Sequence, residues 1–208
     1  MVADVLPLVV PAFEMSIASQ GMSKGTLQSE GPQFVPRAMV KVRRLQFGGQ
    51  WRNVSTNSAK SEAMVFAGWS GKTGAFDLGA SVAYKMLISG TGSGNRRSWE
   101  LTGTAARKFG KFGLRASAVY SPDDFGGTKS SFYLEGGPNY DLCWKLKASA
   151  AIGIRERRNN RDYISFNAGL SRPIGKNSTA DVRYYDTDKG EFGETFDRRV
   201  VGSVKVAI

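Results

Sequence analysis

Apolar and polar side chains alternate along most of this 208-residue chain, and this period of two constrains its fold more than any other feature. In the stretch WKLKASAAIGIRERR, residues 144–158, Leu146 and Ile152 share one parity, while Lys147 and Arg155 share the other. A period of two is typical of a β-strand whose two faces meet different surroundings, and no long stretch keeps the 3.6-residue period of a helix. The chain is therefore predicted to be all β.

The strands that this pattern predicts are joined by connections that alternate in length. The strands cover residues 13–21, 32–43, 45–54, 62–71, 75–88, 97–108, 112–121, 130–141, 144–156, 162–173, 179–187 and 197–208. Connections after odd-numbered strands are long and polar, such as SGTGSGNRRS, whereas those after even-numbered strands are short, such as GKTG and DLC. A membrane barrel has short periplasmic turns and longer outer loops, whereas a Greek-key sandwich has no reason to keep this alternation.

We therefore expect an all-β, transmembrane up-and-down antiparallel β-barrel of about 12 strands. A single outer-membrane barrel is predicted over residues 13–208. Residues 1–12 are interpreted as a leader remnant or a periplasmic N-terminal tail, because they hold an apolar patch without a basic start.

Aromatic side chains mark both ends of the predicted strands. One group begins odd-numbered strands on the apolar parity: Phe13, Phe47, Phe76, Phe112 and Trp144. A second group lies at the opposite ends: Trp51, Tyr84, Trp99, Tyr120, Phe132 and Tyr163. Two such rings are typical of the aromatic girdles of membrane barrels, and packing of aromatic rings beside β-turns is the alternative. The apolar parity is accordingly predicted to contact outer-membrane lipid.

Composition removes several classes of function. The chain has no histidine, so Ser-His and Cys-His catalysis and His-based metal sites are excluded. Its lone cysteine, Cys143, cannot form an internal disulfide. The Gly-rich SGTGSGN lacks the lysine and the following helix of a phosphate-binding loop. We therefore expect no enzyme activity, no cofactor and no metal.

The chain is strongly basic, with 29 Lys and Arg against 18 Asp and Glu and a formal net charge of +11. Such a charge is compatible with nucleic acid, acidic lipid or an anionic solute as partner. A soluble basic nucleic-acid-binding module would present lysines and stacking aromatics on one surface. Here they lie on opposite parities in most strands, so this function is the least favoured and no nucleic-acid partner is expected.

The polar parity is predicted to line the lumen. Its candidate pore-lining residues are Arg37, Lys41, Arg52, Lys85, Glu100, Arg115, Glu135, Lys145, Lys147, Arg155, Asp181, Arg183 and Lys205. Because bases outnumber acids in this set, passive diffusion of small solutes with a preference for anions is predicted. The alternative is a closed, salt-bridged structural barrel without conductance, because about 12 strands leave a lumen that long side chains can fill.

Several segments resemble the TorF-type porin family of proteobacterial outer membranes. They are, in order, MSIASQGMSKGT, FGGQWRNV, FDLGASVAYKM, SFYLEGGPNYDL, ADVRYYDTDKG and DRRVVGSVKVAI. The resemblance implies a small channel-forming barrel in the outer membrane of a Gram-negative bacterium, without enzyme activity. A monomer or weak oligomer is expected.

Overall fold

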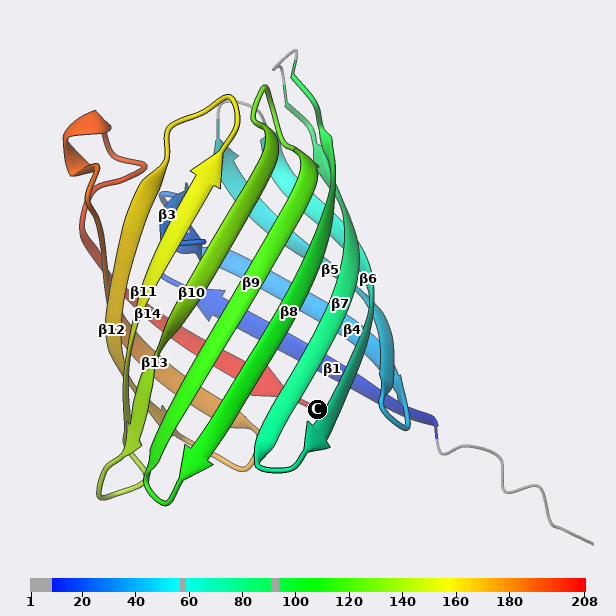
Figure 1. The fold of residues 1–208 in the computed structure, drawn as a ribbon, viewed down its shortest axis with the longest axis vertical. Helices are drawn as coiled ribbons and strands as arrows, with labels where there is room; N and C mark the ends of the chain where they lie inside the picture. Colours follow the sequence, from blue (N-terminus) through cyan, green and yellow to red (C-terminus); the bar gives the residue numbers. More distant parts are fainter. Residues whose placement is uncertain (1–8, 57–58, 91–93) are drawn as a thin grey trace, which may run out of the picture.

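The computed structural model describes residues 9–56, 59–90 and 94–208, and twelve of its strands form one closed barrel (Figure 1). The barrel strands are β1 (Val9–Ala18), β4 (Gln33–Val42), β5 (Leu45–Thr56), β6 (Ala59–Thr73), β7 (Phe76–Ile88), β8 (Arg97–Phe109), β9 (Phe112–Asp124), β10 (Lys129–Asp141), β11 (Lys147–Arg157), β12 (Tyr163–Pro173), β13 (Ser178–Thr187) and β14 (Arg199–Ala207). A short 3-10 helix, η1 (Gly190–Phe192), lies between β13 and β14. In the described ranges, no helix is long and apolar enough to cross a membrane.

Every barrel strand is antiparallel to both of its neighbours, and the first strand closes the ring against the last. At the closure, Phe13 and Ile208 exchange two backbone hydrogen bonds of 2.9 and 2.8 Å. Closure pairs the backbone of every barrel strand on both sides and leaves no open sheet edge. The prediction of twelve antiparallel strands in an up-and-down barrel is therefore confirmed.

The first strand begins earlier than the sequence pattern predicts. Val9 opposes Val42 in the pairing of β1 with β4, so residues 9–12 belong to the barrel wall instead of to a tail. The sequence pattern does not indicate a strand over residues 9–12, because Pro11 and Ala12 interrupt the alternation of large apolar and polar side chains. Residues 1–8 of the predicted leader remnant lie outside the described residues.

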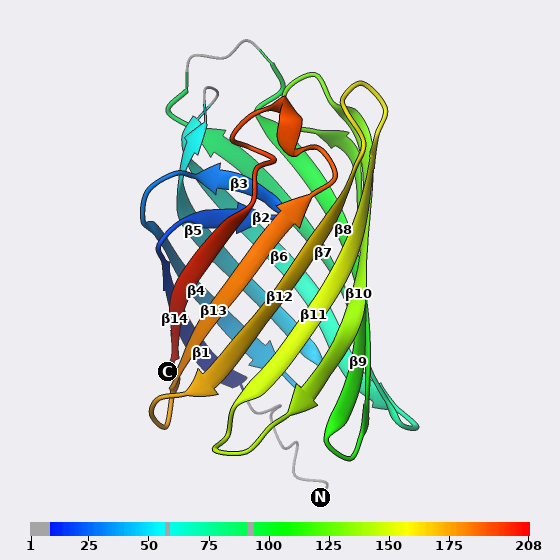
Figure 2. The ribbon, with the colours of Figure 1, turned by 90° about the vertical axis from the view of Figure 1, so that its left-hand side faces the viewer.

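Short turns gather at one end of the barrel, here called the turn end, and the longer connections gather at the other, the loop end (Figures 1 and 2).

The prediction of a strand over residues 144–156 is wrong at its start, where the structure has a turn. Trp144 and Lys145 adopt φ of 54° and 59° and form the centre of a tight turn, in which the Leu146 N–H donates to the Cys143 carbonyl at 3.1 Å. Positive φ at both central residues is what a type I′ hairpin turn requires. The strand β11 therefore starts only at Lys147.

The two faces of the wall differ sharply. Large apolar side chains lie on the outside, where Val65 is 61 % and Val200 is 63 % exposed. The inside carries most of the buried polar and charged groups, including Glu62, Lys85 and Glu100. An apolar exterior around a polar interior inverts the arrangement of a water-soluble protein and is typical of a membrane barrel.

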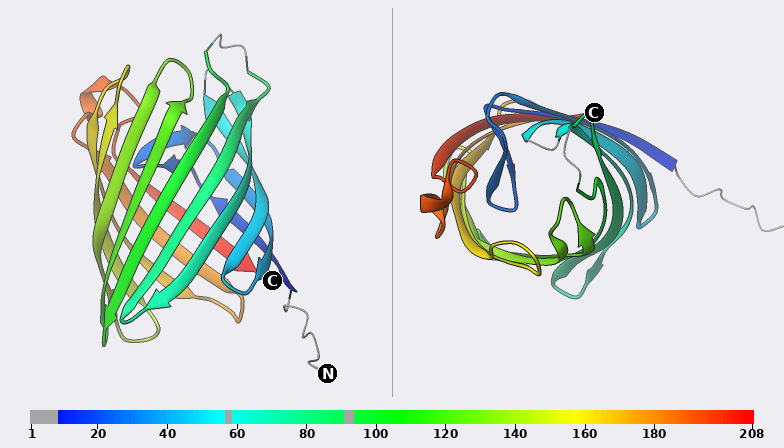
Figure 3. Two further views of the ribbon diagram at one scale, coloured as in Figure 1. Left: turned by 45° about the vertical axis from the view of Figure 1, so that its right-hand side comes forward. Right: turned by 90° about the horizontal axis from the view of Figure 1, so that it is seen from above.

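The first connection at the loop end forms a hairpin of its own. Its strands, β2 (Gly21–Ser23) and β3 (Thr26–Ser29), pair only with each other. Lys24 and Gly25 form its tip with φ of 51° and 82°. The hairpin folds into the barrel instead of projecting away from it (Figures 2 and 3).

Candidate functional site

The candidate site is the interior of the barrel. The structure brings twelve predicted pore-lining residues onto the inner parity of the strands: Arg37, Lys41, Arg52, Lys85, Glu100, Arg115, Glu135, Lys147, Arg155, Asp181, Arg183 and Lys205. Lys145 is the exception, because it lies in the exposed turn before β11. Lys41 and Lys147 lie near the turn end, where Lys147 pairs with Asp141 at 3.5 Å.

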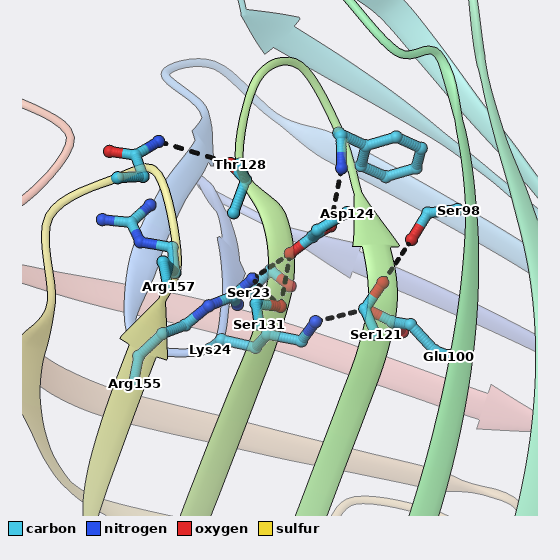
Figure 4. A network of polar contacts seen from close by, with 12 residues as sticks. Ser23, Lys24, Ser98, Glu100, Ser121, Asp124, Thr128, Ser131, Arg155 and Arg157 are labelled. Carbon is cyan, nitrogen blue, oxygen red and sulfur yellow. Dashed lines mark hydrogen bonds and ion pairs between the residues drawn. The ribbon is translucent and has the colours of Figure 1, made fainter.

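Toward the loop end, a chain of ion pairs crosses four neighbouring strands. The Arg52 guanidinium on β5 contacts the Glu62 carboxylate on β6 at 2.9 Å, and Lys85 on β7 lies 3.6 Å from the same carboxylate. Lys85 also lies 3.3 Å from Glu100 on β8, and Lys24 of the hairpin donates to Glu100. Opposite charges alternate along this series of ion pairs, so each buried ion has a partner. Figure 4 shows its last contact, between Lys24 and Glu100.

A second network lies beside the first, on the strands that follow. Arg155 on β11 pairs with Asp124 at the end of β9, and the Ser131 hydroxyl on β10 donates to Asp124 at 2.7 Å. Both networks line one cavity of about 150 Å³ around the hairpin tip. Charged side chains of both networks therefore surround the hairpin tip at this level (Figure 4).

Lys24 contacts Glu100 of the first network and is close enough to the second for Arg155 and Asp124 to act on its charge. Burial and the nearby Arg155 guanidinium lower the pKa of the Lys24 ammonium to about 8, whereas Glu100 acts in the opposite direction. The unfavourable free energy of desolvation and of repulsion by nearby cations therefore exceeds the favourable free energy of the ion pair with Glu100.

The middle of the barrel holds a third, smaller network. Glu135 accepts hydrogen bonds from the Tyr133 hydroxyl at 2.9 Å and the Asn167 amide at 3.2 Å. Arg183 donates to Asn167 at 2.8 Å and to Asp181 at 3.0 Å. These contacts fix polar side chains of β10, β12 and β13 against the wall.

Between this level and the turn end, the interior opens into a cavity of about 480 Å³. Its polar lining is rich in hydroxyl groups and includes Ser81, Thr102, Thr104, Ser117, Asp77 and Arg115. Among the residues that the structure describes, Arg115 forms no ion pair. Its guanidinium is available to a solute in this cavity.

Arg37 is another inward arginine without a carboxylate partner in the described part of the chain. Its guanidinium lies 4.3 Å from the centre of the Phe66 ring. Phe66 packs with Met39 and Ala83 in a buried apolar cluster on the inner face of β4, β6 and β7. This cluster narrows the lumen on one side and gives Arg37 a cation–π contact in place of an ion pair.

The predicted girdle aromatics lie mostly on the outer surface. Exposed on that surface are Phe13, Phe47, Trp51, Phe76, Trp99, Phe112, Tyr120 and Phe132. Tyr84 packs on Trp99 with ring centres 4.9 Å apart. Trp144 is 80 % exposed, but it projects from a turn instead of beginning a strand.

Tyr163 was predicted on the outside and lies on the inside. It is 3 % exposed, and its hydroxyl donates to the Lys24 carbonyl at 2.7 Å. Its neighbour Ile164 continues the apolar parity of β12, so strict alternation already places Tyr163 on the polar side.

Sequence reasoning missed several interior residues. Met39 and Phe66 are apolar but lie on the inner face of β4 and β6. Their even spacing from the inward residues Arg37 and Glu62 in the sequence could have indicated this position. Lys24 and Asp124 lie outside the strands that the sequence predicts. Asp124 is the last residue of β9, which extends beyond the predicted end at residue 121, and Lys24 belongs to a hairpin whose inward path no local sequence signal indicates. No group of three or more His, Cys, Asp or Glu side chains in the described ranges could hold a metal ion.

A closed twelve-stranded antiparallel barrel with an apolar exterior and a charged interior is the architecture of an outer-membrane β-barrel, a fold that this chain shares with solved porins. The chain belongs to the Gcw_chp family, described as bacterial proteins of unknown function, whose sequence profile matches residues 43–208. The barrel fold that the resemblance to TorF-type porins implies is present, whereas the family profile that matches is not described as TorF-type. No curated protein matches the chain.

Solved structures of outer-membrane porins share the fold at low sequence identity. A KdgM porin is 14 % identical with a TM-score of 0.60, over 94 % of this chain and 98 % of that one. A KdgM porin in complex with disordered oligogalacturonate is 11 % identical with a TM-score of 0.58, over 96 % and 98 %. The COG4313 outer membrane channel from Pseudomonas putida F1 is 11 % identical with a TM-score of 0.59, over 99 % and 97 %.

Proposed function

We propose that this protein is a channel for passive diffusion of small solutes across the outer membrane of a Gram-negative bacterium, with a preference for anions. The observation that carries the proposal is the surplus of inward bases, among which Arg37 and Arg115 have no carboxylate partner in the described residues. Both arginines lie on the lumen wall, and Arg115 lines the large cavity.

The physical argument rests on where positive charge stays uncompensated. A pore wall of low dielectric focuses the field of fixed charges along the axis, so a surplus of cations lowers the barrier for anions and raises it for cations. The wall also offers hydroxyl groups at Ser81, Thr102 and Thr104, which can hydrogen-bond a partly dehydrated solute. A similar barrel, the KdgM porin, has been solved with oligogalacturonate, which supports a solute path through this fold.

The proposal places the apolar exterior against outer-membrane lipid, with the aromatic side chains at the headgroup level. It includes a monomer or weak oligomer, no nucleic-acid partner and no enzymatic reaction. The narrower kinship with TorF-type porins belongs to the same proposal and rests on the order of the matching segments and the YYDTD motif.

A closed structural barrel is the second candidate, and one observation favours it. The ion pairs around Glu62 and Glu100, together with the hairpin, leave a cavity of only about 150 Å³ at the loop end. A lumen filled in this way at all times would pass no solute.

Swelling of liposomes that contain the purified protein tests the proposal. Small anionic and cationic organic solutes of equal size are compared, and faster swelling with the anionic solute is expected. Equal rates, or faster swelling with the cation, would remove the anion preference. Swelling no faster than in protein-free liposomes would favour the closed barrel.

Charge reversal at one arginine tests the source of the preference. Arg115→Glu is expected to shift the zero-current potential in a KCl gradient toward the value for cations, because the lumen loses a free guanidinium and gains a carboxylate. Lys145→Glu changes the formal charge equally but lies in the turn outside the lumen, so it should leave the potential close to that of the parent. Equal shifts in both variants would show that total charge matters, and not its place on the wall.

A further inference from the structure

The hairpin of β2 and β3 is attached to the barrel wall by few interactions. Its strands form a separate two-stranded sheet, so no ladder of backbone hydrogen bonds joins them to a barrel strand. An isolated two-stranded hairpin is marginally stable in water, and its position depends on what it docks against. The hairpin can therefore leave its seat without breaking the barrel.

The tip of the hairpin contacts two barrel strands, β12 and β8. The Tyr163 hydroxyl of β12 donates to the Lys24 carbonyl, while the Lys24 ammonium reaches Glu100 of β8. At Gly25 the backbone lies so close to β12 that an added Cβ would stand 2.2 Å from the Cβ of Ser165. Only glycine allows this approach, and Gly25 also has a φ of 82° that other residues rarely adopt.

One further contact fixes the hairpin at the loop end. The Leu27 N–H donates to the Thr195 carbonyl, in the connection between β13 and β14, at 3.0 Å. Leu27 is also the buried apolar side chain of the hairpin. Docking therefore depends on a small set of hydrogen bonds, one ion pair and little apolar burial.

The electrostatics of the tip weaken the docked position. Burial and the repulsion from Arg155 and Lys85 lower the pKa of Lys24 to about 8, although Glu100 and Asp124 attract its ammonium. An ammonium that loses more by desolvation than it gains from its partners opposes docking near neutral pH. The docked and undocked positions are thus closer in free energy than the number of contacts suggests.

We propose that the hairpin of β2 and β3 is a movable gate, latched across the lumen by Lys24 and Gly25, and that its undocking opens the loop end of the channel. This gate rests on the proposed channel function. The latched position corresponds to the filled interior around Glu100, and the unlatched position connects the cavity at Arg115 to the loop end.

One pair of glycine variants tests the latch. Gly25→Val cannot approach Ser165 and is expected to raise single-channel conductance in planar bilayers. Gly31→Val is the matched control, because nothing lies within 4 Å of its added Cβ and the same loop carries the same substitution. Conductance of Gly25→Val equal to that of the parent and the control would overturn the gate.

A disulfide provides the opposite perturbation, in a Cys143→Ser background. The hydrogen bond between Leu27 and Thr195 brings their backbones within reach of a disulfide, so Leu27→Cys with Thr195→Cys should lock the hairpin in place. Mass spectrometry confirms the bond. The oxidised protein is expected to conduct less than the reduced protein, and the background variant should not respond to reductant.

The outcomes separate the gate from the channel itself. If the oxidised protein conducts as well as the reduced protein, the gate is wrong while the channel stands. If a variant with residues 20–31 replaced by a short Gly-Ser linker inserts into bilayers and conducts nothing, the proposed channel function fails.

Discussion

Replacement of Ile152 by arginine is expected to destabilise the folded barrel by about 2 to 4 kcal/mol, because it places a charge against lipid at the membrane midplane. Ile152 is half exposed on the outer face, and it opposes Gly136, which in turn opposes Ala116. This row lies midway between the outward aromatic side chains of β9, Phe112 and Tyr120. Urea titration of the protein in liposomes, followed by the fraction that keeps its folded mobility on a gel, measures the loss.

The matched control places the same side chain on the inner face. Thr104 opposes Ser117 next to the same row and lines the large cavity, so Thr104→Arg should be much less destabilising than Ile152→Arg. If Thr104→Arg costs as much as Ile152→Arg, or if Ile152→Arg costs nothing, the assignment of the two faces is wrong.

A second large effect is expected at the centre of the ion-pair chain. Glu62 is 3 % exposed and is the shared partner of Arg52 and Lys85. Glu62→Gln keeps the shape of the side chain but leaves two buried cations without this carboxylate, and removal of one partner from a buried pair costs about 3 to 5 kcal/mol. The same urea titration measures the change.

Asp77→Asn is the control for Glu62→Gln. Asp77 pairs with Lys72 at 3.6 Å, but both side chains are exposed, and such pairs contribute about 0 to 1 kcal/mol. Comparable losses in the two variants would mean that the interior around Glu62 is wet and its ion pairs are screened.

The barrel could be predicted from the sequence because its cause is local. Each wall strand separates an apolar from a polar environment, so the alternation in a stretch such as residues 147–157 is visible without any knowledge of its neighbours. The alternation of long and short connections then gives the up-and-down order. The turn at Trp144 and Lys145 was missed because the alternation continues through it, whereas the turn depends on backbone dihedral angles.

The filled part of the lumen could not be predicted in the same way. The Lys24 tip meets Glu100 and Tyr163 only because a hairpin far away in sequence folds across the barrel. Nothing in its own composition distinguishes it from a loop that projects into water. The alternation of polar and apolar side chains predicts which wall residues face the lumen. Which of them form hydrogen bonds or ion pairs with the hairpin depends on the path of this loop.

The central claim is that the barrel conducts and prefers anions, and the zero-current potential of the unmodified protein tests it most directly. The purified protein is inserted into a planar bilayer with concentrated KCl on one side and dilute KCl on the other. A potential with the sign set by chloride movement is the predicted result, because the guanidinium groups of Arg37 and Arg115, which have no carboxylate partner in the described residues, favour anions. A potential with the sign set by potassium, or bilayers that contain the protein and carry no current, would contradict it.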